Sequence, residues 1–496
     1  MIYHKLEQYN ITQPGKVAVI CKKTKITYSQ LFFQIHAISH WISAQVKSKS
    51  PIGILLPNSL NAILAFLAVP LSQKIAVPLD PSVHKRNLEK TLQEGDITHI
   101  ITTKKFKPLF KNHPELICWY VENLDQFKIV YGVEHGHVSL LNSYFPINSV
   151  SPNETAYIFF TTGSTGAPKG VMLSHTNLFV AASNIVNYMG MDDTVVESLP
   201  MPLSHSFGFA RLRAVLQSGG TVIIENGLLF INKVLENIKT HNANALSMVP
   251  TGYSLMLTTY LTYFKGIAPS LKFIELGSAV MKRKFKEQLI EVCSNAIICM
   301  HYGSTEASRS TFINFRKDKY FIDSIGKPTP SVNIKLLDEK GNVIIQTGEL
   351  GEVVVSSDTV SKGYWKNEKL TKEKFKPDGY HMGDIAKYDK NGYLYLVGRK
   401  HDLMNINGFN VSPKEIEIVI ESHPWVVEVA IIQKPDQEFK TNGITAYVVT
   451  SQPVKLRELT KFCKQELESY KIPSLIIFLE KLPKTWSGEV EKNKLT

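Results

Sequence analysis

Residues 157–170, YIFFTTGSTGAPKG, carry the most structural information in this 496-residue sequence. Their apolar beginning predicts a strand, and a loop rich in glycine and hydroxyl groups follows and ends in Lys169. Glycines let backbone N–H groups approach an anion, hydroxyls donate hydrogen bonds, and lysine adds positive charge. The stretch therefore predicts a phosphate-binding loop rather than a flexible surface turn. It is not a Walker loop, because Pro168 stands where that motif needs its second glycine.

Around this loop, short apolar runs alternate with segments of helical period, which is α/β patterning. Residues 51–56 (PIGILL) predict a buried strand, residues 61–72 a helix and residues 75–78 the next strand. Two strands joined through a helix form a βαβ unit, so a parallel sheet is expected.

After residue 331 the pattern changes to short alternating strands separated by turns rich in Gly and Asp, which predicts a small β-subdomain. A hairpin is expected at residues 389–395. The polar segment 398–402, GRKHD, separates this region from a helix with a marked start. We therefore predict an N-terminal domain of residues 1–398, a hinge at 399–402 and a C-terminal domain of residues 403–496.

The first helix of the C-terminal domain has clear start signals. Ser412 is the expected cap, Pro413 suits the first turn, and Glu415 completes a capping box. The apolar positions that should face a core are Ile416, Val419 and Ile420.

Charge and composition limit the classes of partner. The chain has 56 Lys and Arg against 44 Asp and Glu, a net charge of +12, which favours anionic partners such as nucleotides, coenzyme A or acidic proteins. The charges are spread as singlets and pairs, so nucleic-acid binding, suggested only by the net charge, is not expected. The five cysteines form no CxxC pair, so neither a zinc site nor a disulfide framework is expected. No apolar signal core opens the sequence, and the apolar run 62–71 is too short to span a bilayer, so we expect a cytoplasmic protein.

The loop TTGSTGAPKG resembles the signature loop of the adenylate-forming (AMP-binding) superfamily. That superfamily comprises acyl- and aryl-CoA synthetases, adenylation enzymes of nonribosomal and polyketide synthesis, and luciferase-like enzymes. Further stretches resemble the family in the same order: ITYSQL, PLDPS, MPLSHSFGF, YGSTEAS, GELGEV, KGYWKN, YHMGDIAKYDKNGYLYLVGRKHD and NGFNVSPKEIE. The resemblance implies a large N-terminal domain of doubly wound α/β subdomains with a small β-subdomain, followed by a small, mobile α+β domain.

The resemblance also implies a site for ATP and Mg²⁺. Its implied catalytic residues are Lys169, His205, Thr305 and Glu306, with Thr305 on the phosphates and Glu306 on the metal, which prefers oxygen ligands. The implied cofactor-binding residues are Thr161, Thr162, Gly163, Ser164, Thr165 and Gly166 in the loop, Gly277, Ser278, Ala279, Tyr302 and Gly303 around adenine, Asp384 and Arg399 at the ribose, and Asn405 and Gly408 in the C-terminal domain. The alternatives are a helix N-cap box for residues 302–306, a core histidine for His205, and a surface ion pair for Asp384 and Arg399.

The acid-binding pocket implied by the resemblance is drawn from residues 207–209, 247–253, 276–279 and 303–309. No acidic residue lies in SHSFGFAR, whereas relatives that activate amino acids place an aspartate there to hold the α-ammonium group. We therefore expect an apolar or aromatic acid that is not an α-amino acid. Arg211, Arg213 and Arg309 are candidates for a second substrate carboxylate, but we expect them at the surface.

Two positions depart from the family pattern. His401 stands at the hinge position, where Asp402 follows. Glu489 replaces the lysine of the terminal motif, which in the family reaches the acyl carboxylate and the α-phosphate.

The main hypothesis is an acid–thiol ligase that forms an acyl-AMP and passes the acyl group to coenzyme A or to the phosphopantetheine arm of an acidic carrier protein. The alternative is a nucleotide- or acyl-binding regulatory protein whose adenylation is impaired by Glu489.

Overall fold

The computed structural model describes residues 1–47, 49–83, 85–122, 144–162, 168–402, 404–406, 409–435, 442–484 and 490–495. Contacts between Cα atoms divide the chain into two compact units. The first unit is Met1–Ile334 with Val355–Tyr380, and the second is Lys335–Val354 with His381–Thr496. None of the described helices combines the length and the apolar character needed to cross a membrane.

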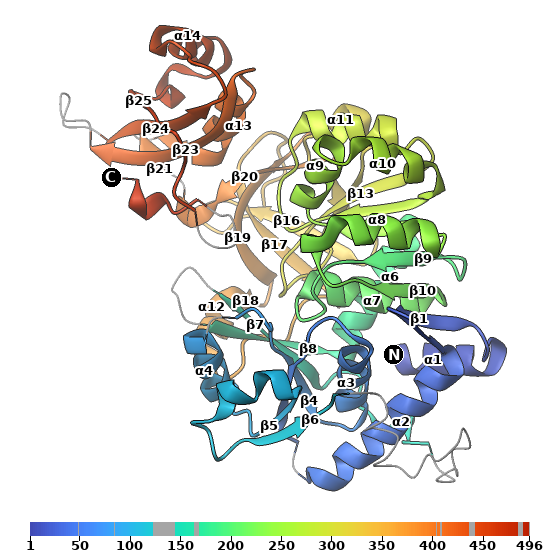
Figure 1. Ribbon diagram of the computed structural model, residues 1–496. Coiled ribbons are helices and arrows are strands. Elements are labelled where there is room, and N and C mark those ends of the chain that lie inside the picture. The colour runs from blue at the N-terminus through green and yellow to red at the C-terminus, as the bar shows by residue number, and fades with distance from the viewer. Residues whose placement is uncertain are drawn as a thin grey trace. The chain divides into compact units, whose positions relative to one another are not determined.

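A nine-stranded sheet forms the larger part of the first unit (Figure 1). Its order is β15 (Lys327–Pro328), β14 (Thr311–Asn314), β13 (Ile297–Tyr302), β12 (Phe273–Leu276), β11 (Ala245–Met248), β9 (Val196–Leu199), β10 (Thr221–Ile224), β1 (Val17–Cys21) and β2 (Thr24–Thr27). The pairs from β13 to β1 are parallel, and β14, β15 and β2 add antiparallel edges. β11 and β12 are buried along their whole length, as expected when helices cover both faces of a parallel sheet.

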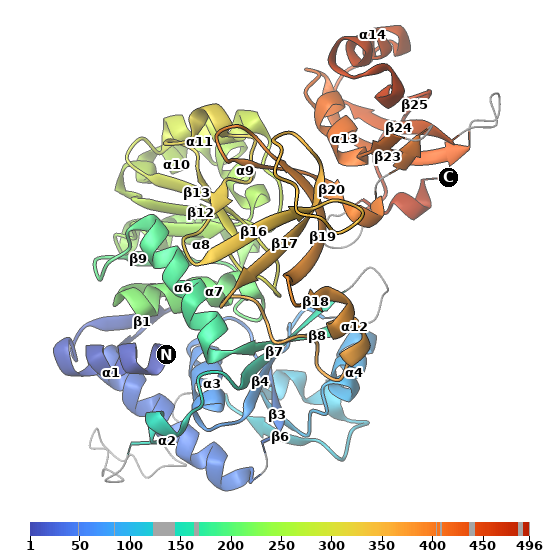
Figure 2. The same cartoon turned by 180° about the vertical axis from the view of Figure 1, so that it is seen from behind.

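Two groups of helices cover this sheet. The first group is α1 (Ile2–Thr12), α6 (His175–Met189) and α7 (Ser206–Ser218), and α7 contacts both α1 and α6. The second group is α8 (Ile231–Thr240), α9 (Pro250–Thr258), α10 (Leu261–Ile267) and α11 (Arg283–Val292). Helix α8 lies toward the viewer in Figure 1, whereas α6 lies toward the viewer in Figure 2, which shows the reverse side. The sheet is therefore wound on both faces.

A six-stranded sheet completes the first unit. Its order is β6 (Ile117–Tyr120), β5 (His99–Thr102), β3 (Pro51–Leu55), β4 (Ile75–Pro78), β7 (Thr155–Thr162) and β8 (Pro168–Ser174), and its helices are α2 (Tyr28–Gln45), α3 (Leu60–Leu71) and α4 (Lys85–Glu94). The predicted βαβ unit is confirmed, because β3 and β4 pair in parallel and α3 connects them. Ser59 caps α3, since its hydroxyl accepts a hydrogen bond from the backbone N–H of Ala62 at 3.2 Å.

The predicted short strands after residue 331 are present. They are β16 (Val332–Leu337), β17 (Gly351–Ser357), β18 (Phe375–Lys376), β19 (Gly379–Tyr388) and β20 (Leu394–Arg399), with α12 (Glu368–Lys374) before β18. The hairpin predicted at residues 389–395 is confirmed as the turn between β19 and β20, which pair antiparallel.

The remaining second unit is α+β, as predicted. It contains β21 (Met404–Ile406) and β22 (Phe409–Val411), then α13 (Pro413–Glu421), β23 (Val426–Pro435), β24 (Asn442–Thr450), α14 (Leu456–Glu466) and β25 (Leu475–Phe478). Ser412 caps α13 by accepting from the N–H of Glu415 at 3.3 Å. Ile416 and Ile420 are fully buried in the core, and Val419 packs against it. The predicted fold class, a large α/β part followed by a small α+β part, is confirmed.

Candidate functional site

The loop that carries Thr305 and Glu306 connects β13 to β14 and is held by several hydrogen bonds. The Ser304 hydroxyl accepts from the N–H of Ala307 at 3.2 Å, and the N–H of Ser361 donates to the Glu306 carbonyl at 2.7 Å. The hydroxyls of Thr305 and Ser206 lie 3.1 Å apart, which joins the loop to the first residue of α7. No helix begins in residues 302–310, which the structure describes throughout, so the expected alternative of an N-cap box is wrong. The chain instead turns into the antiparallel strand β14.

Two glycines let neighbouring segments approach this loop. A Cβ at Gly303 would lie 2.6 Å from the Ala307 carbonyl oxygen, so the loop folds back on itself only with glycine there. A Cβ at Gly277 would lie 1.9 Å from the imidazole of His301, so the histidine ring occupies the space beside that backbone.

The residues expected around adenine follow two neighbouring parallel strands. Ser278 comes just after the end of β12, and Tyr302 is the last residue of β13. Carboxyl ends of adjacent parallel strands lie at the same edge of a sheet, where α/β proteins bind their ligands. Ser278 has φ of +69°, a left-handed backbone uncommon for a residue other than glycine, and such strained positions cluster at functional sites.

His205 lies immediately before α7 and is not a core residue. Its side chain is 55% exposed, and its Nε2 lies 2.9 Å from Oδ2 of Asp80, which follows β4. Burial of Asp80 opposes ionisation, but hydrogen bonds from His205 and Ser82 outweigh burial and lower the pKa of Asp80 to about 2. An ionised Asp80 therefore orients the imidazole, and the expected alternative of a buried, satisfied histidine is wrong.

Part of the phosphate loop lies outside the described residues. These are Gly163, Ser164, Thr165 and Gly166, together with the side chain of Thr162. The two ends of the loop are described. Thr161 on β7 and Lys169 on β8 are register partners in an antiparallel hairpin.

The residues expected at the ribose lie in the second unit. Asp384 and Arg399 are register partners on β19 and β20, and their Oδ1 and Nη1 atoms are 3.0 Å apart. The Asp384 side chain is buried and that of Arg399 is 61% exposed. The ion pair exists, and its acidic partner is held in the fold rather than at the surface. Gly408, the Asn405 side chain and Glu489 lie outside the described residues.

Arg211, Arg213 and Arg309 were expected at the surface, and this expectation is wrong. All three are among the most deeply buried side chains of the first unit. Arg211 and Arg309 are retained inside because two glutamates, Glu197 on β9 and Glu275 on β12, are also fully buried. Sequence reasoning missed these glutamates and His301. The available signal was a single carboxylate inside each of two otherwise uncharged strands, VESL and FIEL.

These side chains form one buried ionic cluster, which we define as Glu197, Arg211, Glu275, His301 and Arg309. Arg211 donates to both oxygens of Glu197, through Nε at 3.0 Å and through Nη2, and its Nη1 donates to Glu275 at 2.7 Å. Arg309 donates from Nε to Glu275 at 3.3 Å and from Nη2 to the Phe207 carbonyl at 3.3 Å. His301 Nδ1 lies 2.6 Å from Glu275.

The charges of the cluster balance as two carboxylates against two guanidinium groups. Burial, followed by the nearby Arg309, lowers the pKa of His301, so its imidazole is neutral near pH 7. Burial works against ionisation of Glu275, but Arg309 and Arg211 hold the pKa of that carboxyl well below its usual range. The cluster connects β12 and β13 to α7. The two strands lead into the segments expected around adenine, and α7 begins directly after His205.

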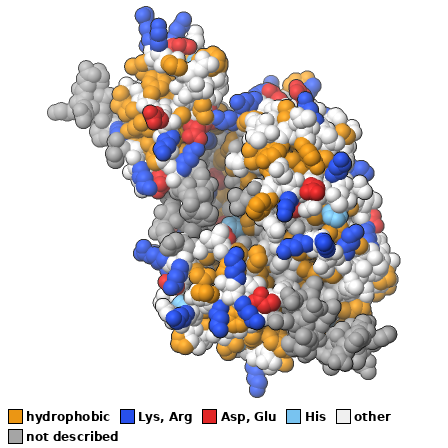
Figure 3. All heavy atoms as spheres, in the orientation of Figure 1, with side chains coloured by type: hydrophobic (Ala, Val, Ile, Leu, Met, Phe, Trp, Pro, Cys, Tyr) orange, Lys and Arg blue, Asp and Glu red, His pale blue; other side chains and the backbone are white. Residues whose placement is uncertain are grey.

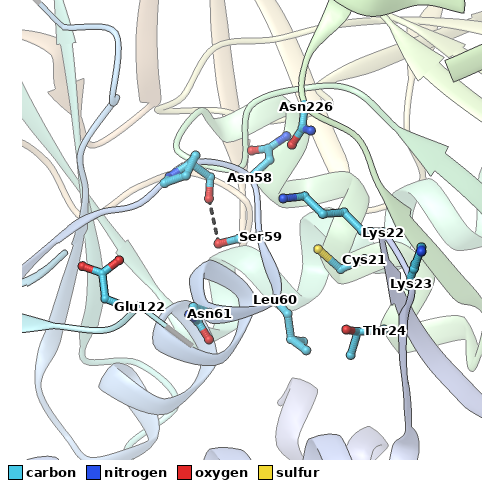
Figure 4. Close-up of a pocket in the computed structure, with 11 residues that line it drawn as sticks. Cys21, Lys22, Lys23, Thr24, Asn58, Ser59, Leu60, Asn61, Glu122 and Asn226 are labelled. Atoms are coloured by element: carbon cyan, nitrogen blue, oxygen red, sulfur yellow. Dashed lines mark hydrogen bonds between the residues drawn. The ribbon is translucent and has the colours of Figure 1, made fainter. Parts of the chain in front are cut away.

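An open cavity elsewhere in the first unit is separate from these residues (Figure 4). It lies at the β1–β2 turn and the start of α3, and its lining includes Lys22, Lys23, Ser59, Asn61 and Asn226. None of the predicted site residues lines it. Figure 3 shows Lys and Arg side chains scattered over the visible face among apolar and neutral ones, without one continuous basic surface.

Comparison with known proteins identifies relatives along the whole chain. The family model described as AMP-binding enzyme matches residues 6–365, and that of the AMP-binding enzyme C-terminal domain matches residues 415–489. The 2-succinylbenzoate–CoA ligase of Bacillus licheniformis is 29% identical over 99% of this chain and 98% of its own. Tyrocidine synthase 3 of Brevibacillus parabrevis is 28% identical over 97% of this chain, which spans only 7% of that synthase.

A solved structure has the same fold. The o-succinylbenzoate coenzyme A synthetase of Bacillus subtilis, in complex with ATP and a magnesium ion, is 25% identical, with a TM-score of 0.84. The match covers 99% of this chain and 98% of that one.

Proposed function

The chain belongs to the AMP-binding enzyme family, whose model matches residues 6–365, and from this premise we propose that it activates a carboxylic acid with ATP and Mg²⁺ and then forms a thioester. A carboxylate oxygen of the acid attacks the α-phosphorus of ATP, pyrophosphate leaves, and an acyl-AMP results. A thiol sulfur then attacks the acyl carbon, and AMP leaves. The proposed thiol is that of coenzyme A or of a carrier protein's phosphopantetheine.

One observation carries the proposal more than any other. Described hydrogen bonds and strand pairing bring together three parts of the first unit: the Thr305–Glu306 loop, Ser206 at the start of α7, and the ends of β12 and β13. The sequence places these segments up to about 100 residues apart, so their assembly supports a shared site. Its donor set, hydroxyls beside a carboxylate, suits a nucleotide phosphate and a hard cation.

The family resemblance gives the site residues of this chain their proposed roles, and the arrangement supports them. Glu306 would hold Mg²⁺, which when bound neutralises phosphate charge and stabilises the leaving pyrophosphate. Thr305 and Lys169 would bind phosphate oxygens. His205, oriented by Asp80, would stand beside the acid. Catalysis of this kind comes mainly from positioning and from fixed charges and dipoles.

For the substrate we propose an apolar or aromatic acid that is not an α-amino acid. The first two turns of α7, SFGFARL, contain no carboxylate for an α-ammonium group. Arg211 and Arg309 are each paired with buried glutamates of the chain itself, which disfavours their use on a second substrate carboxylate.

The test is ATP–pyrophosphate exchange against a panel of aliphatic, aromatic and dicarboxylic acids, with EDTA as the metal-free control. We expect exchange with at least one apolar or aromatic acid, lost when EDTA is added. Absence of exchange with every acid, together with normal ATP binding by calorimetry, would contradict the proposal and favour a nucleotide-binding regulatory role.

Glu489 is the observation that favours this second role. A carboxylate where the family has a lysine would repel the reacting carboxylate and phosphate, by roughly 4 kcal/mol at 4 Å and an effective dielectric near 20. If Glu489 limits adenylation, Glu489→Lys should raise the exchange rate at least about tenfold, since one missing charge-stabilising donor typically costs about 10²- to 10³-fold. Acyl transfer from pre-made acyl-AMP should change little. Equal exchange rates in the two proteins would show that Glu489 does not impair the reaction.

A further inference from the structure

Residues 360–365 connect the exit strand of the phosphate loop to the loop that carries Glu306. On one side, the N–H of Trp365 donates to the Gly170 carbonyl at 2.7 Å, and the N–H of Met172 donates to the Gly363 carbonyl at 3.0 Å, so the segment is joined to β8. On the other side, the N–H of Ser361 donates to the Glu306 carbonyl at 2.7 Å. Backbone hydrogen bonds therefore fix this segment against both loops.

Tyr364 lies near the end of this segment, and its side chain reaches that of Glu306. Its ring is buried and packs edge-on against Phe375, with centroids 5.5 Å apart. Its backbone N–H donates to the Thr371 hydroxyl at 2.9 Å. Its phenolic O–H donates to Oε1 of Glu306 at 2.8 Å. Tyr364 is thus held through its backbone by Thr371 and through its ring by Phe375, and its hydroxyl is aimed at one oxygen of the Glu306 carboxylate.

Building on the proposed function, we propose that Tyr364 is a positioning residue for Glu306 that orients its carboxylate toward the magnesium ion. The hydrogen bond occupies Oε1 and limits rotation of the carboxylate, so Glu306 would hold the ion in a fixed orientation. A neutral donor does this without cancelling the negative charge that the ion requires. Loss of a partner that orients a metal ligand typically weakens metal binding by about 10- to 100-fold.

The test measures metal affinity directly. Mn²⁺ is titrated into protein saturated with α,β-methylene-ATP, and free Mn²⁺ is followed by electron paramagnetic resonance. We expect Tyr364→Phe to weaken Mn²⁺ binding by about 10-fold or more. Nucleotide affinity in EDTA should change less than about twofold, since without the metal this hydrogen bond has no ion to position.

The matched control is Tyr28→Phe. Tyr28 is also fully buried in the first unit, and its hydroxyl donates to a backbone carbonyl, that of Gly220, at 2.7 Å. It should leave Mn²⁺ affinity unchanged. A second variant, with 4-aminophenylalanine in place of Tyr364, keeps a donor at the same position and should recover most of the affinity even if Tyr364→Phe is unstable.

Three results would overturn the inference. The first is unchanged Mn²⁺ affinity in Tyr364→Phe beside an active wild type. The second is an equal loss of Mn²⁺ affinity in Tyr28→Phe, and the third is no recovery of Mn²⁺ affinity with 4-aminophenylalanine. Either of these two results would show a general packing effect. A wild type that binds no Mn²⁺ with the nucleotide is a different result, because it removes the proposed function itself.

Discussion

Two arginines on α7, Arg211 and Arg213, are both fully buried, yet their surroundings differ completely. Arg211 meets both oxygens of Glu197 and one of Glu275. No carboxylate among the described residues pairs with Arg213, whose guanidinium group instead lies near the Tyr157 phenol and over the Phe209 ring, 5.6 Å from the centroid. Residues two apart on a helix point to different sides, so one arginine faces carboxylates on the sheet and the other faces aromatic rings.

The groups around Arg213 carry no negative charge to balance it. Burial raises the pKa of Tyr157 to about 12, so the phenol stays neutral. Burial also lowers the pKa of His175 to about 3, so this imidazole stays neutral too. The comparison teaches that burial alone does not decide what a charged side chain contributes. Removing one partner of a buried ion pair lowers stability, whereas burying a charge without an opposite charge lowers the stability of the folded protein itself.

The largest expected effect comes from removing the carboxylate that both buried arginines of the cluster share. Glu275→Ala leaves Arg211 and Arg309 without one of their partners, so we expect the free energy of unfolding to fall by about 3 to 5 kcal/mol. Urea unfolding measures it as a lower midpoint at similar slope. A loss below about 1 kcal/mol would mean that the cluster reorganises around the missing charge.

A smaller effect is expected on the pH dependence of stability, through His175 near Arg213. The folded-state pKa of His175, about 3, lies below its unfolded value, so the folded protein binds fewer protons and loses stability as pH falls below about 6.5. Between pH 7 and pH 5, the free energy of unfolding should therefore fall by about 2 kcal/mol less in His175→Gln than in the wild type. Glu275 does not interfere, because a depressed carboxyl pKa costs stability only below about pH 4.3. Thermal melts of both proteins across this range give the measurement, and parallel pH profiles would contradict the prediction.

The smallest effect is expected at Arg213 itself. Arg213→Met removes an unbalanced cation and keeps much of the side-chain volume. The free energy of unfolding should therefore change by less than about 1 kcal/mol, or rise. Arg211→Met is the matched control two residues away. It leaves two buried carboxylates and should destabilise by about 3 to 5 kcal/mol. Similar losses in the two variants would remove the distinction between the two environments.

Features encoded by neighbouring residues were predicted correctly. The β3–α3–β4 unit follows from local apolar runs, and the start of α13 follows from Ser412 and Pro413. The turn between β19 and β20 follows from its Gly and Asp. In each case the sequence signal lies in short runs of neighbouring residues, which is the range that periodicity and capping rules describe.

Features that depend on distant partners were not predicted. Arg309 lies in the loop between β13 and β14 and pairs inside the fold with Glu275 on β12, and no local sequence pattern predicts that pairing. The alternative of a helix cap at residues 302–306 was wrong for the same reason, because pairing of β14 with β13 decides the path of the chain there. The roles of the site residues stay predictions, and their individual contacts now show what to measure.

The position of β1 in the nine-stranded sheet has a consequence for how the protein is made. Val19 pairs in parallel with Val222, so β1 needs a neighbour that emerges from the ribosome about 200 residues later. At about 5 to 20 residues per second, the roughly 200 intervening residues take about 10 to 40 s to synthesise. Throughout that interval β1 can pair with β2 on one edge, but its parallel neighbour on the other edge has not been made. The β1 edge of the nine-stranded sheet therefore forms well after β1 itself has been synthesised.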